Sequence, residues 1–341
     1  MGLDKHLHEI DINVFPGEYK RLRDIIDSIE LQYGTDNTNM QHIDELVCEY
    51  AKLLKQTAKI VRISDNNQQK LRNARQKLET QNQVISVKNQ ELNRANEKIL
   101  LELKRAAEYV RSIIPEPAAF DSHNLKIDWS FIPSLHLGGD LLGFKQLDSE
   151  HFALYLLDVC GHGVRSALYS VSVVNTINNA HMTGIDYRDP GELLNALNQQ
   201  YQMKDHDNLY FTIWYGVYNH KSKILNYCAA GHPPAFLLDQ NLALTQLGSD
   251  NFFIGIIKDT HYKSEQVEIV PPANLMIYSD GAYEIPIDGD EMMTINQFAD
   301  FIYESFKANE DIKDIYDKLV KLYDNNPLDD DFSILKASFR Q

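Results

Sequence analysis

Apolar residues in the first part of the chain recur at the spacing of an α-helix. Residues 19–31 and 39–62 predict two helices, with apolar faces formed by Leu22, Ile25, Ile26 and Ile29 in the first and by Ile43, Leu46, Val47, Tyr50, Leu53 and Leu54 in the second. Because a helix cannot bury such a face alone, we expect these faces to pair within or between chains. We interpret residues 1–62 as a helical regulatory or dimerisation region: either a small sensor or docking module, or a cap on the segment that follows.

Residues 63–112 have a different pattern, without proline or glycine and rich in charged and amide side chains. Apolar residues recur there every seven positions, at Leu71, Leu78, Ile85, Leu92, Ile99, Ala106 and Ile113. This heptad spacing predicts a coiled coil. The second seam is more polar, with Ala74, Gln81, Lys88 and Ala95, and polar seam residues set register at a cost in stability. We expect a parallel homodimer through this linker; the alternative is a single solvated helix.

After Ile113-Ile114-Pro115 the pattern changes from helical to alternating, as in half-buried strands. Strands are predicted at 125–131, 151–157, 210–218, 224–229, 235–238, 266–270, 275–279 and 332–339. Residues 210–218 and 224–229 are expected to form one hairpin, and 266–270 and 275–279 a second strand pair. Helices are predicted at 164–180, 190–203, 294–306 and 311–323. Residues 113–341 are therefore expected to form an α+β domain in which two antiparallel sheets pack face to face with helices outside.

Four aspartates stand at the turns that end or begin these strands: Asp140, Asp158, Asp280 and Asp330. Carboxylate oxygens and retained waters are the ligands preferred by magnesium and manganese. Two such ions, about 3.5–4 Å apart, generate a nucleophile from water and clamp a phosphoryl oxygen. The alternative for each single position is an ordinary Asp-Gly turn.

Composition narrows the classes of function. The 341-residue chain is 43% hydrophobic, which is enough for a packed core, and its net charge of −16 argues against binding to a nucleic-acid backbone. Its three cysteines are widely spaced, so we expect no disulfide framework and a cytoplasmic location. The sequence has no predicted signal peptide, and its apolar runs are shorter than the ~20 residues of a membrane helix.

The motifs around these aspartates resemble, in chain order, those of the type 2C metal-dependent serine/threonine phosphatases of the bacterial RsbU/SpoIIE-like branch. They are Ile113-Ile114-Pro115, Gly138-Gly139-Asp140, Asp158-Val159-Cys160-Gly161-His162-Gly163, Ala230-Gly231-His232-Pro233-Pro234, Tyr278-Ser279-Asp280-Gly281 and Asp330-Asp331-Phe332-Ser333. The resemblance covers about residues 113–339. The first 62 residues resemble no family that we can name.

The resemblance implies a centre of two Mg²⁺ or Mn²⁺ ions. Asp158 corresponds to the carboxylate that bridges both ions, the Val159 carbonyl adds a backbone oxygen, and Asp140, Asp280 and Asp330 supply the other carboxylates; Asp329 and Asp331 are rivals of Asp330. The implied activity is hydrolysis of phosphoserine or phosphothreonine on a signalling protein, an anti-sigma-factor antagonist in related systems, under control of the coiled coil. The alternative is an inactive scaffold of the same fold that acts by protein–protein interaction.

The sequence departs from the family pattern at two positions. Gly143 replaces an acid that often follows the Gly-Gly-Asp motif, where we expect a local packing effect, and Cys160 replaces a histidine that is a candidate general acid in animal relatives. We do not transfer that role to His162. His232 is expected to stiffen its turn by a hydrogen bond, and Arg165 is expected to be a surface residue of a helix.

Overall fold

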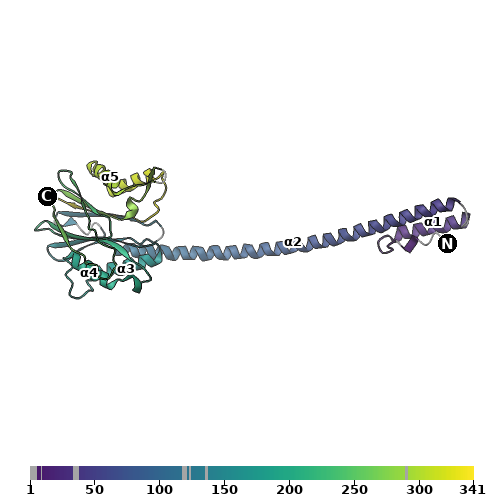
Figure 1. Ribbon diagram of the computed structural model, residues 1–341, viewed down its shortest axis with the longest axis horizontal. Coiled ribbons are helices and arrows are strands. Elements are labelled where there is room, and N and C mark those ends of the chain that lie inside the picture. Colours follow the sequence, from purple (N-terminus) through teal and green to yellow (C-terminus); the bar gives the residue numbers. More distant parts are fainter. Residues whose placement is uncertain are drawn as a thin grey trace. The chain divides into compact units, whose positions relative to one another are not determined.

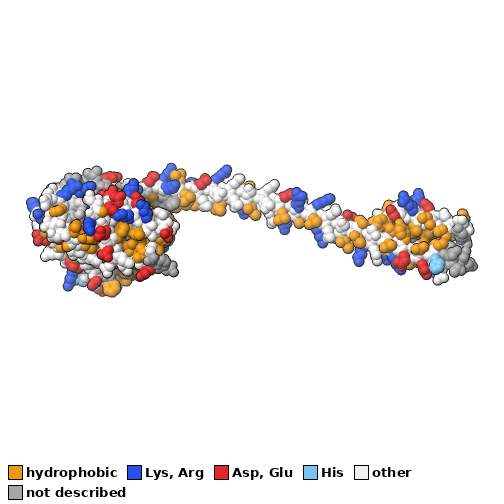
Figure 2. Space-filling view, turned by 90° about the horizontal axis from the view of Figure 1, so that it is seen from above, with side chains coloured by type: hydrophobic (Ala, Val, Ile, Leu, Met, Phe, Trp, Pro, Cys, Tyr) orange, Lys and Arg blue, Asp and Glu red, His pale blue; other side chains and the backbone are white. Residues whose placement is uncertain are grey.

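A computed structural model describes the chain except for residues 1–5, 9, 34–37, 117–120, 123, 135–136 and 289–290. The chain forms two compact units, residues 1–97 and residues 98–341. The first unit consists of helix α1 (Pro16–Tyr33) and the first part of helix α2 (Thr38–Ile113). Leu22 and Ile26 of α1 are buried with Val47, Ala51 and Leu54 of α2. Figure 2 shows the hydrophobic side chains gathered over this pair of helices.

The expected helix over 39–62 and the expected coiled coil over 63–112 form one uninterrupted helix, α2. It ends at Ile113, where Pro115 follows and prevents a regular continuation. In the part of the chain that the structure describes, neither α2 nor any other helix is long and apolar enough to cross a membrane.

The second unit is built on two antiparallel sheets with helices outside, as the sequence predicted (Figure 1). The first sheet has the order β1-β2-β13-β10-β7-β8, from strands β1 (Asp121–Ser122), β2 (Leu125–Ile132), β13 (Phe332–Phe339), β10 (Ala273–Tyr278), β7 (Ala235–Leu238) and β8 (Leu244–Leu247). The second has the order β3-β4-β5-β6-β9, from β3 (Leu141–Gln146), β4 (His151–Val159), β5 (Phe211–Asn219), β6 (Ile224–Ala230) and β9 (Glu265–Glu268). A small ribbon joins β11 (Pro286–Asp288) and β12 (Glu291–Met292).

Alternation along the strands explains how the first sheet is buried on both faces. In β10, Leu275 and Ile277 contribute to the core between the two sheets, whereas Met276 and Tyr278 contribute to a second core on the outer face. Successive side chains of a strand point to opposite faces, so a continuous apolar strand requires cover on both sides. That cover is supplied by helices.

Two pairs of helices provide the cover. Helices α3 (Val164–Asn178) and α4 (Pro190–Gln200) contact strands of the second sheet, and α5 (Ile295–Lys307) and α6 (Ile312–Leu322) bury apolar residues in the outer core of the first (Figure 1). Asp189 caps α4 by accepting hydrogen bonds from the backbone of Gly191 and Glu192. Capping boxes start α5 at Thr294 and α6 at Asp311.

One expected strand pairing is wrong. Residues 265–268 (β9) pair with β6 in the second sheet, whereas 273–278 (β10) pair with β7 and β13 in the first. Pro271 and Pro272 lie between the two strands and have no N–H to donate to a ladder. The chain therefore crosses from one sheet to the other here instead of turning back in a hairpin.

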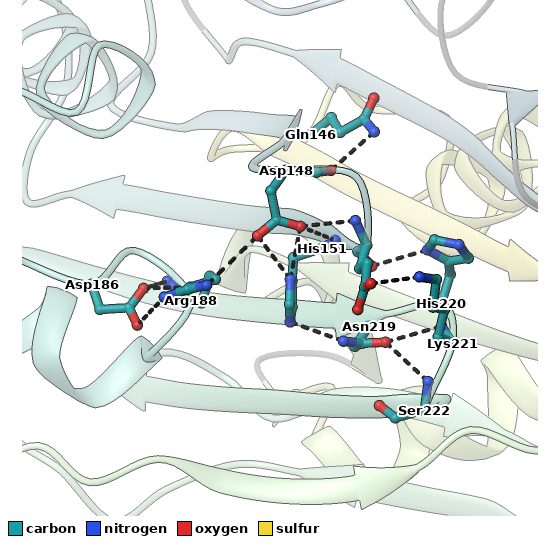
Figure 3. Close-up of polar contacts among 10 residues, drawn as sticks. Gln146, Asp148, His151, Asp186, Arg188, Asn219, His220, Lys221 and Ser222 are labelled. Atoms are coloured by element: carbon teal, nitrogen blue, oxygen red, sulfur yellow. Dashed lines mark hydrogen bonds and ion pairs between the residues drawn. The ribbon is translucent and has the colours of Figure 1, made fainter.

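A polar network fixes the register of β4 at the end remote from Asp158 (Figure 3). The Asp148 carboxylate accepts hydrogen bonds from the backbone N–H groups of Glu150 and His151, at 2.8 and 2.9 Å. The His151 ring joins Asp148 through Nδ1 (2.8 Å) and Asn219 through Nε2 (2.9 Å). Asn219 in turn accepts from the backbone of Lys221 and Ser222, both at 2.9 Å. The network thus connects the turn before β4 to the turn after β5.

Candidate metal centre

Three of the four predicted aspartates line one cavity of about 610 Å³. Asp158 lies near the end of β4, Asp280 begins a 3-10 turn immediately after Ser279, and Asp330 precedes β13. Asp280 accepts a hydrogen bond from the backbone of Gly281 (2.8 Å) and Asp330 from the backbone of Asp331 (2.7 Å). Residues more than 170 positions apart in sequence are therefore brought to one acidic cleft by the meeting of the two sheets.

The fourth aspartate, Asp140, is 2% exposed and is not among the residues that line the cavity. Its Oδ2 atom is buried without a hydrogen-bond partner among the described residues. Burial, followed by repulsion from Asp158 and Asp331, holds the pKa of the Asp140 carboxyl well above its usual range. An orphaned buried acceptor beside other acids is a costly arrangement that a cation relieves.

The other acids are perturbed in the same direction. Burial, with repulsion from Asp280, Asp330 and Asp331, raises the pKa of Asp158 to about 8. Burial, with repulsion from Asp330, raises the pKa of Asp280 to about 6. Burial also raises the pKa of Asp330. Clustered carboxylates with raised pKa values are typical of functional sites, and their all-oxygen chemistry fits magnesium or manganese.

The candidate ligand side chains form an open site and do not by themselves enclose an ion. Within the described residues, no three His, Cys, Asp or Glu side chains converge tightly enough to enclose a metal directly. Magnesium keeps several waters and uses one or two carboxylates, so it fits an open acidic cleft of this kind. Val159 is fully buried, and its carbonyl oxygen lies against Gly139.

Asp331 and Asp329, the rivals of Asp330, have other contacts. Asp331 is 4% exposed, and its carboxylate accepts hydrogen bonds from the backbone (2.9 Å) and hydroxyl (3.2 Å) of Ser134 and from the backbone of Asp140 (3.5 Å). Asp329 lines the cavity and accepts a hydrogen bond from the Tyr323 hydroxyl (2.8 Å). Asp331 thus ties the start of β13 to the loop before β3, whereas Asp330 faces the cleft.

The departures from the family pattern have local explanations. A Cβ at Gly143 would lie 2.3 Å from the Tyr155 hydroxyl, which donates to Asn178 at 2.7 Å, so an acid at 143 is excluded by a buried tyrosine. The Cys160 sulfur accepts a hydrogen bond from the backbone of Tyr210 (3.3 Å), and burial raises the pKa of its thiol. Arg165 is exposed and donates to the Asp207 carbonyl (3.0 Å).

Several further residues of the cleft have no recognisable signal in the sequence. The walls of the cleft also include Ser134, Tyr210, Thr212, Phe253, Pro327 and Leu328. Thr212 stands directly opposite Asp158 in the β4–β5 ladder. Alternation alone predicted the two strands but not their register, so this neighbour of Asp158 had no detectable signal.

Gly139 permits the close approach of two loops of the centre. A Cβ at this position would lie 2.4 Å from the carbonyl oxygen of Val159 and 3.0 Å from that of Gly161. We expect Gly139→Ala to destabilise the fold by about 1–3 kcal/mol, because both obstructing atoms belong to backbone that cannot rotate away. Thermal unfolding checks this. Gly17→Ala is the matched control, since nothing lies within 4 Å of its Cβ, and equal melting temperatures for both variants would contradict the expectation.

Solved structures with the same fold share this arrangement of sheets. The chain is similar to the PP2C domain of SiaA from Pseudomonas aeruginosa, with a TM-score of 0.62 and 20% identity over 72% of this chain and 98% of that chain. It is also similar to the PP2C phosphatase domain and regulatory-domain fragment of SpoIIE from Bacillus subtilis, with a TM-score of 0.53 and 16% identity over 63% of each chain. The fold is therefore that of the PP2C phosphatases.

Residues 148–340 match the family model described as stage II sporulation protein E (SpoIIE). The chain belongs to the SpoIIE family. Among its curated relatives from Bacillus subtilis (strain 168), phosphoserine phosphatase RsbP is 29% identical over 55% of this chain and phosphoserine phosphatase RsbU is 26% identical over 70%. The chain spans about half of RsbP (47%) and 70% of RsbU.

Proposed function

We propose that this protein is a metal-dependent phosphatase that hydrolyses phosphoserine or phosphothreonine on a signalling protein. Two Mg²⁺ or Mn²⁺ ions would be held by Asp140, Asp158, Asp280 and Asp330, with the Val159 carbonyl as a further oxygen. The observation that carries the proposal is the convergence of Asp158, Asp280 and Asp330 on one cavity, with the buried Asp140 near Asp158 and its Oδ2 atom without a hydrogen-bond partner among the described residues. The phosphoserine phosphatase names of RsbP and RsbU support it.

When bound, such ions supply charge neutralisation and an activated water. The chain's own residues bind the ions and orient the substrate. Asp158 and Asp280 must give up their protons to serve as ligands. Because their pKa values are raised to about 8 and about 6, the carboxylates form as the pH rises through these values, and metal binding is expected to strengthen over the same range. Tyr210, Phe253 and Leu328 stand beside the acids in the cavity wall and supply apolar surface against the substrate.

The test uses the full chain with a phosphorylated anti-sigma-factor antagonist, the substrate that the family resemblance implies, and a phosphoserine peptide as a general probe. We expect phosphate release with Mn²⁺, none with EDTA, and none from Asp158→Asn. Binding of Mn²⁺ is measured separately by isothermal titration. Metal binding without hydrolysis of either probe, or hydrolysis insensitive to EDTA, would contradict the proposal; a folded chain that binds neither metal nor phosphate but still binds a protein partner would favour the scaffold alternative.

The homodimer also belongs to this proposal. Leu71, Leu78, Ile85, Leu92 and Ile99 are 56–69% exposed, at the heptad spacing. The second seam of the heptad, which includes Ala74 and Gln81, continues back to Ile60, Leu53 and Leu46, and these three side chains are 58–71% exposed. A single helix would leave this seam in water, whereas a parallel second copy buries it.

The last turns of α2 could transmit a change in the coiled coil to the metal centre through their packing. Val110 and Ile114 are buried in the main core of the second unit. A small cavity of about 170 Å³ is lined by Ala107, Glu108, Val110 and Arg111 of α2 and by Phe131, Pro133, Leu137 and Gly138, and Gly138 immediately precedes Gly139 and Asp140. We therefore propose that the packing of this helix end regulates the phosphatase.

Cysteine crosslinking tests the coil in the full chain. Leu78→Cys is expected to form a disulfide-linked dimer on mild oxidation, because equivalent seam positions of parallel helices face each other. Gln76→Cys, on the opposite side of the heptad, is the matched control and should remain monomeric on denaturing gels. The unsubstituted chain, with Cys48, Cys160 and Cys228, gives the background. A monomer in light scattering, with no crosslink at Leu78, would contradict the homodimer.

A further inference from the structure

A buried histidine and a threonine of the cleft wall form a hydrogen-bonded pair beside Asp158. Thr212, the second residue of β5, lines the cavity and stands opposite Asp158 in the β4–β5 ladder. Its Oγ1 atom lies 2.7 Å from Nδ1 of His232, in the turn that follows β6. His232 is 6% exposed and does not line the cavity. The histidine therefore contacts the cleft only through the threonine.

The charge of the histidine is set by its surroundings. Burial lowers the pKa of His232 to about 3, and the backbone of Tyr278 opposes this shift only in part. The ring is thus neutral at physiological pH and carries one N–H, so one ring nitrogen donates and the other accepts. Its Nε2 atom is buried and makes no hydrogen bond of regular geometry with the described residues, so the interaction of the ring with the backbone of Tyr278 is weak.

Hydrogen-bond accounting selects the direction of the contact. If Nδ1 carried the proton, the Thr212 hydroxyl would turn its own proton toward the open cleft, and the buried Nε2 atom would hold an unused lone pair. If Nε2 carries the proton, the Thr212 hydroxyl donates to Nδ1, and the ring has its N–H available for the backbone of Tyr278, whose interaction with the ring raises the pKa of His232. The second arrangement costs less, because a buried ring nitrogen without any partner is expensive.

A hydroxyl that donates to His232 turns its lone pairs elsewhere. Thr212 then presents an acceptor to the cleft, next to the carboxylate of Asp158. We propose that Thr212, held as an acceptor by His232, takes a hydrogen bond from the attacking water beside Asp158 and so orients that water; His232 is a positioning residue. This inference rests on the proposed phosphatase function.

The tautomer is measured first, on the metal-free full chain, by the ¹⁵N chemical shifts of the His232 ring. We expect proton on Nε2 and a hydrogen-bonded, unprotonated Nδ1 across pH 5 to 8, with the Nδ1 shift altered in Thr212→Val. A proton on Nδ1 would overturn the proposal. Because this readout requires neither metal nor turnover, it separates the hydrogen-bond assignment from the phosphatase activity.

Kinetics of matched variants test the role of the pair. Thr212→Val is isosteric without the hydroxyl, and we expect kcat to fall at least about tenfold with KM little changed, since misdirecting a reacting group affects the chemical step. Thr212→Ser should recover most of that loss. His232→Leu removes the acceptor and should act like Thr212→Val, whereas His232→Asn keeps an oxygen near the Nδ1 position and should be milder. The double variant Thr212→Val with His232→Leu should lose no more than either single variant.

Binding and folding readouts exclude a purely structural role. Titration with Mn²⁺ and thermal unfolding in EDTA are expected to differ little between Thr212→Val and Thr212→Ser, although their kcat values differ. If kcat per folded molecule is the same in both, the pair only fastens a turn and the proposal is overturned. A wild-type chain that binds Mn²⁺ but hydrolyses no phosphate would overturn the proposed function and the catalytic part of this inference, while the tautomer would still decide the hydrogen bond.

Discussion

Replacing Asp158 by asparagine is expected to abolish hydrolysis and, in the metal-free protein, to stabilise the fold at pH 8. The amide is isosteric with the carboxylate but a poorer ligand, and a metal centre contributes several kcal/mol to a phosphoryl-transfer barrier. At about 1.4 kcal/mol per factor of ten, we expect kcat/KM to fall by about 1000-fold or more. Phosphate release from a phosphoserine peptide with Mn²⁺ measures this loss.

The gain in stability follows from the raised pKa of Asp158, about 8 in the fold against 3.8 for an ordinary aspartate. Between these values the native state binds more protons than the unfolded state, so the stability of the metal-free protein falls as the pH rises from about 4 to 8. Each pKa unit corresponds to about 1.4 kcal/mol, so the cost at pH 8 is on the order of several kcal/mol. Asparagine does not ionise, so the Asp158→Asn variant avoids this loss of stability.

Urea unfolding in EDTA at pH 5 and pH 8 tests whether the stability of the metal-free protein falls as the pH rises. The wild type should lose stability between the two pH values and regain it at pH 8 when Mn²⁺ is added, whereas Asp158→Asn should lose less and respond weakly to the metal. Asp317→Asn is the matched control, because Asp317 is exposed on α6 and does not line the cleft. Identical pH dependence of the wild type and Asp158→Asn would refute the burial and mutual repulsion of these acids.

Asp331→Ala is expected mainly to lose stability, whereas Asp330→Ala is expected mainly to lose activity. Removing the Asp331 carboxylate leaves the backbone N–H of Ser134 and that of Asp140 without their acceptor. Since a buried polar group left unsatisfied costs about 1–3 kcal/mol, we expect a loss of stability of about 2–3 kcal/mol. Asp330→Ala should leave the unfolding transition near that of the wild type and lower kcat/KM by about 100-fold or more, as the loss of a metal ligand does.

The stabilities of the two variants are best compared at pH 5. Asp331 raises the pKa values of Asp140 and Asp158 by repulsion. At higher pH its removal therefore relieves this repulsion, and the gain in stability offsets the loss of the hydrogen bonds. Urea unfolding at pH 5 together with Mn²⁺-dependent turnover at neutral pH separates the two effects. If Asp331→Ala kept its stability and lost turnover while Asp330→Ala stayed active, Asp331 would be the ligand.

Many of the strands and helices could be predicted from the sequence, because the patterns that indicate them lie within single segments. Alternation along 125–131, 151–157 and 210–218 predicted strands that the structure contains as β2, β4 and β5. The capping residues Asp189, Thr294 and Asp311 start helices close to the expected positions. The pairing of 266–270 with 275–279 failed, because nothing local to either strand states which sheet it joins.

What the sequence determined by itself is therefore the set of elements and the chemistry available at their ends: apolar strands, a heptad seam, and aspartates at the turns. Only the tertiary structure decided which of these meet. Asp330 and Asp331 are neighbours with nearly identical sequence signals, yet one faces the cleft and the other is buried among backbone donors. Likewise strand register places Thr212 opposite Asp158, and the turn after β6 brings His232 to Thr212. Periodicity is a property of one segment, whereas register and convergence depend on contacts between segments distant in the chain.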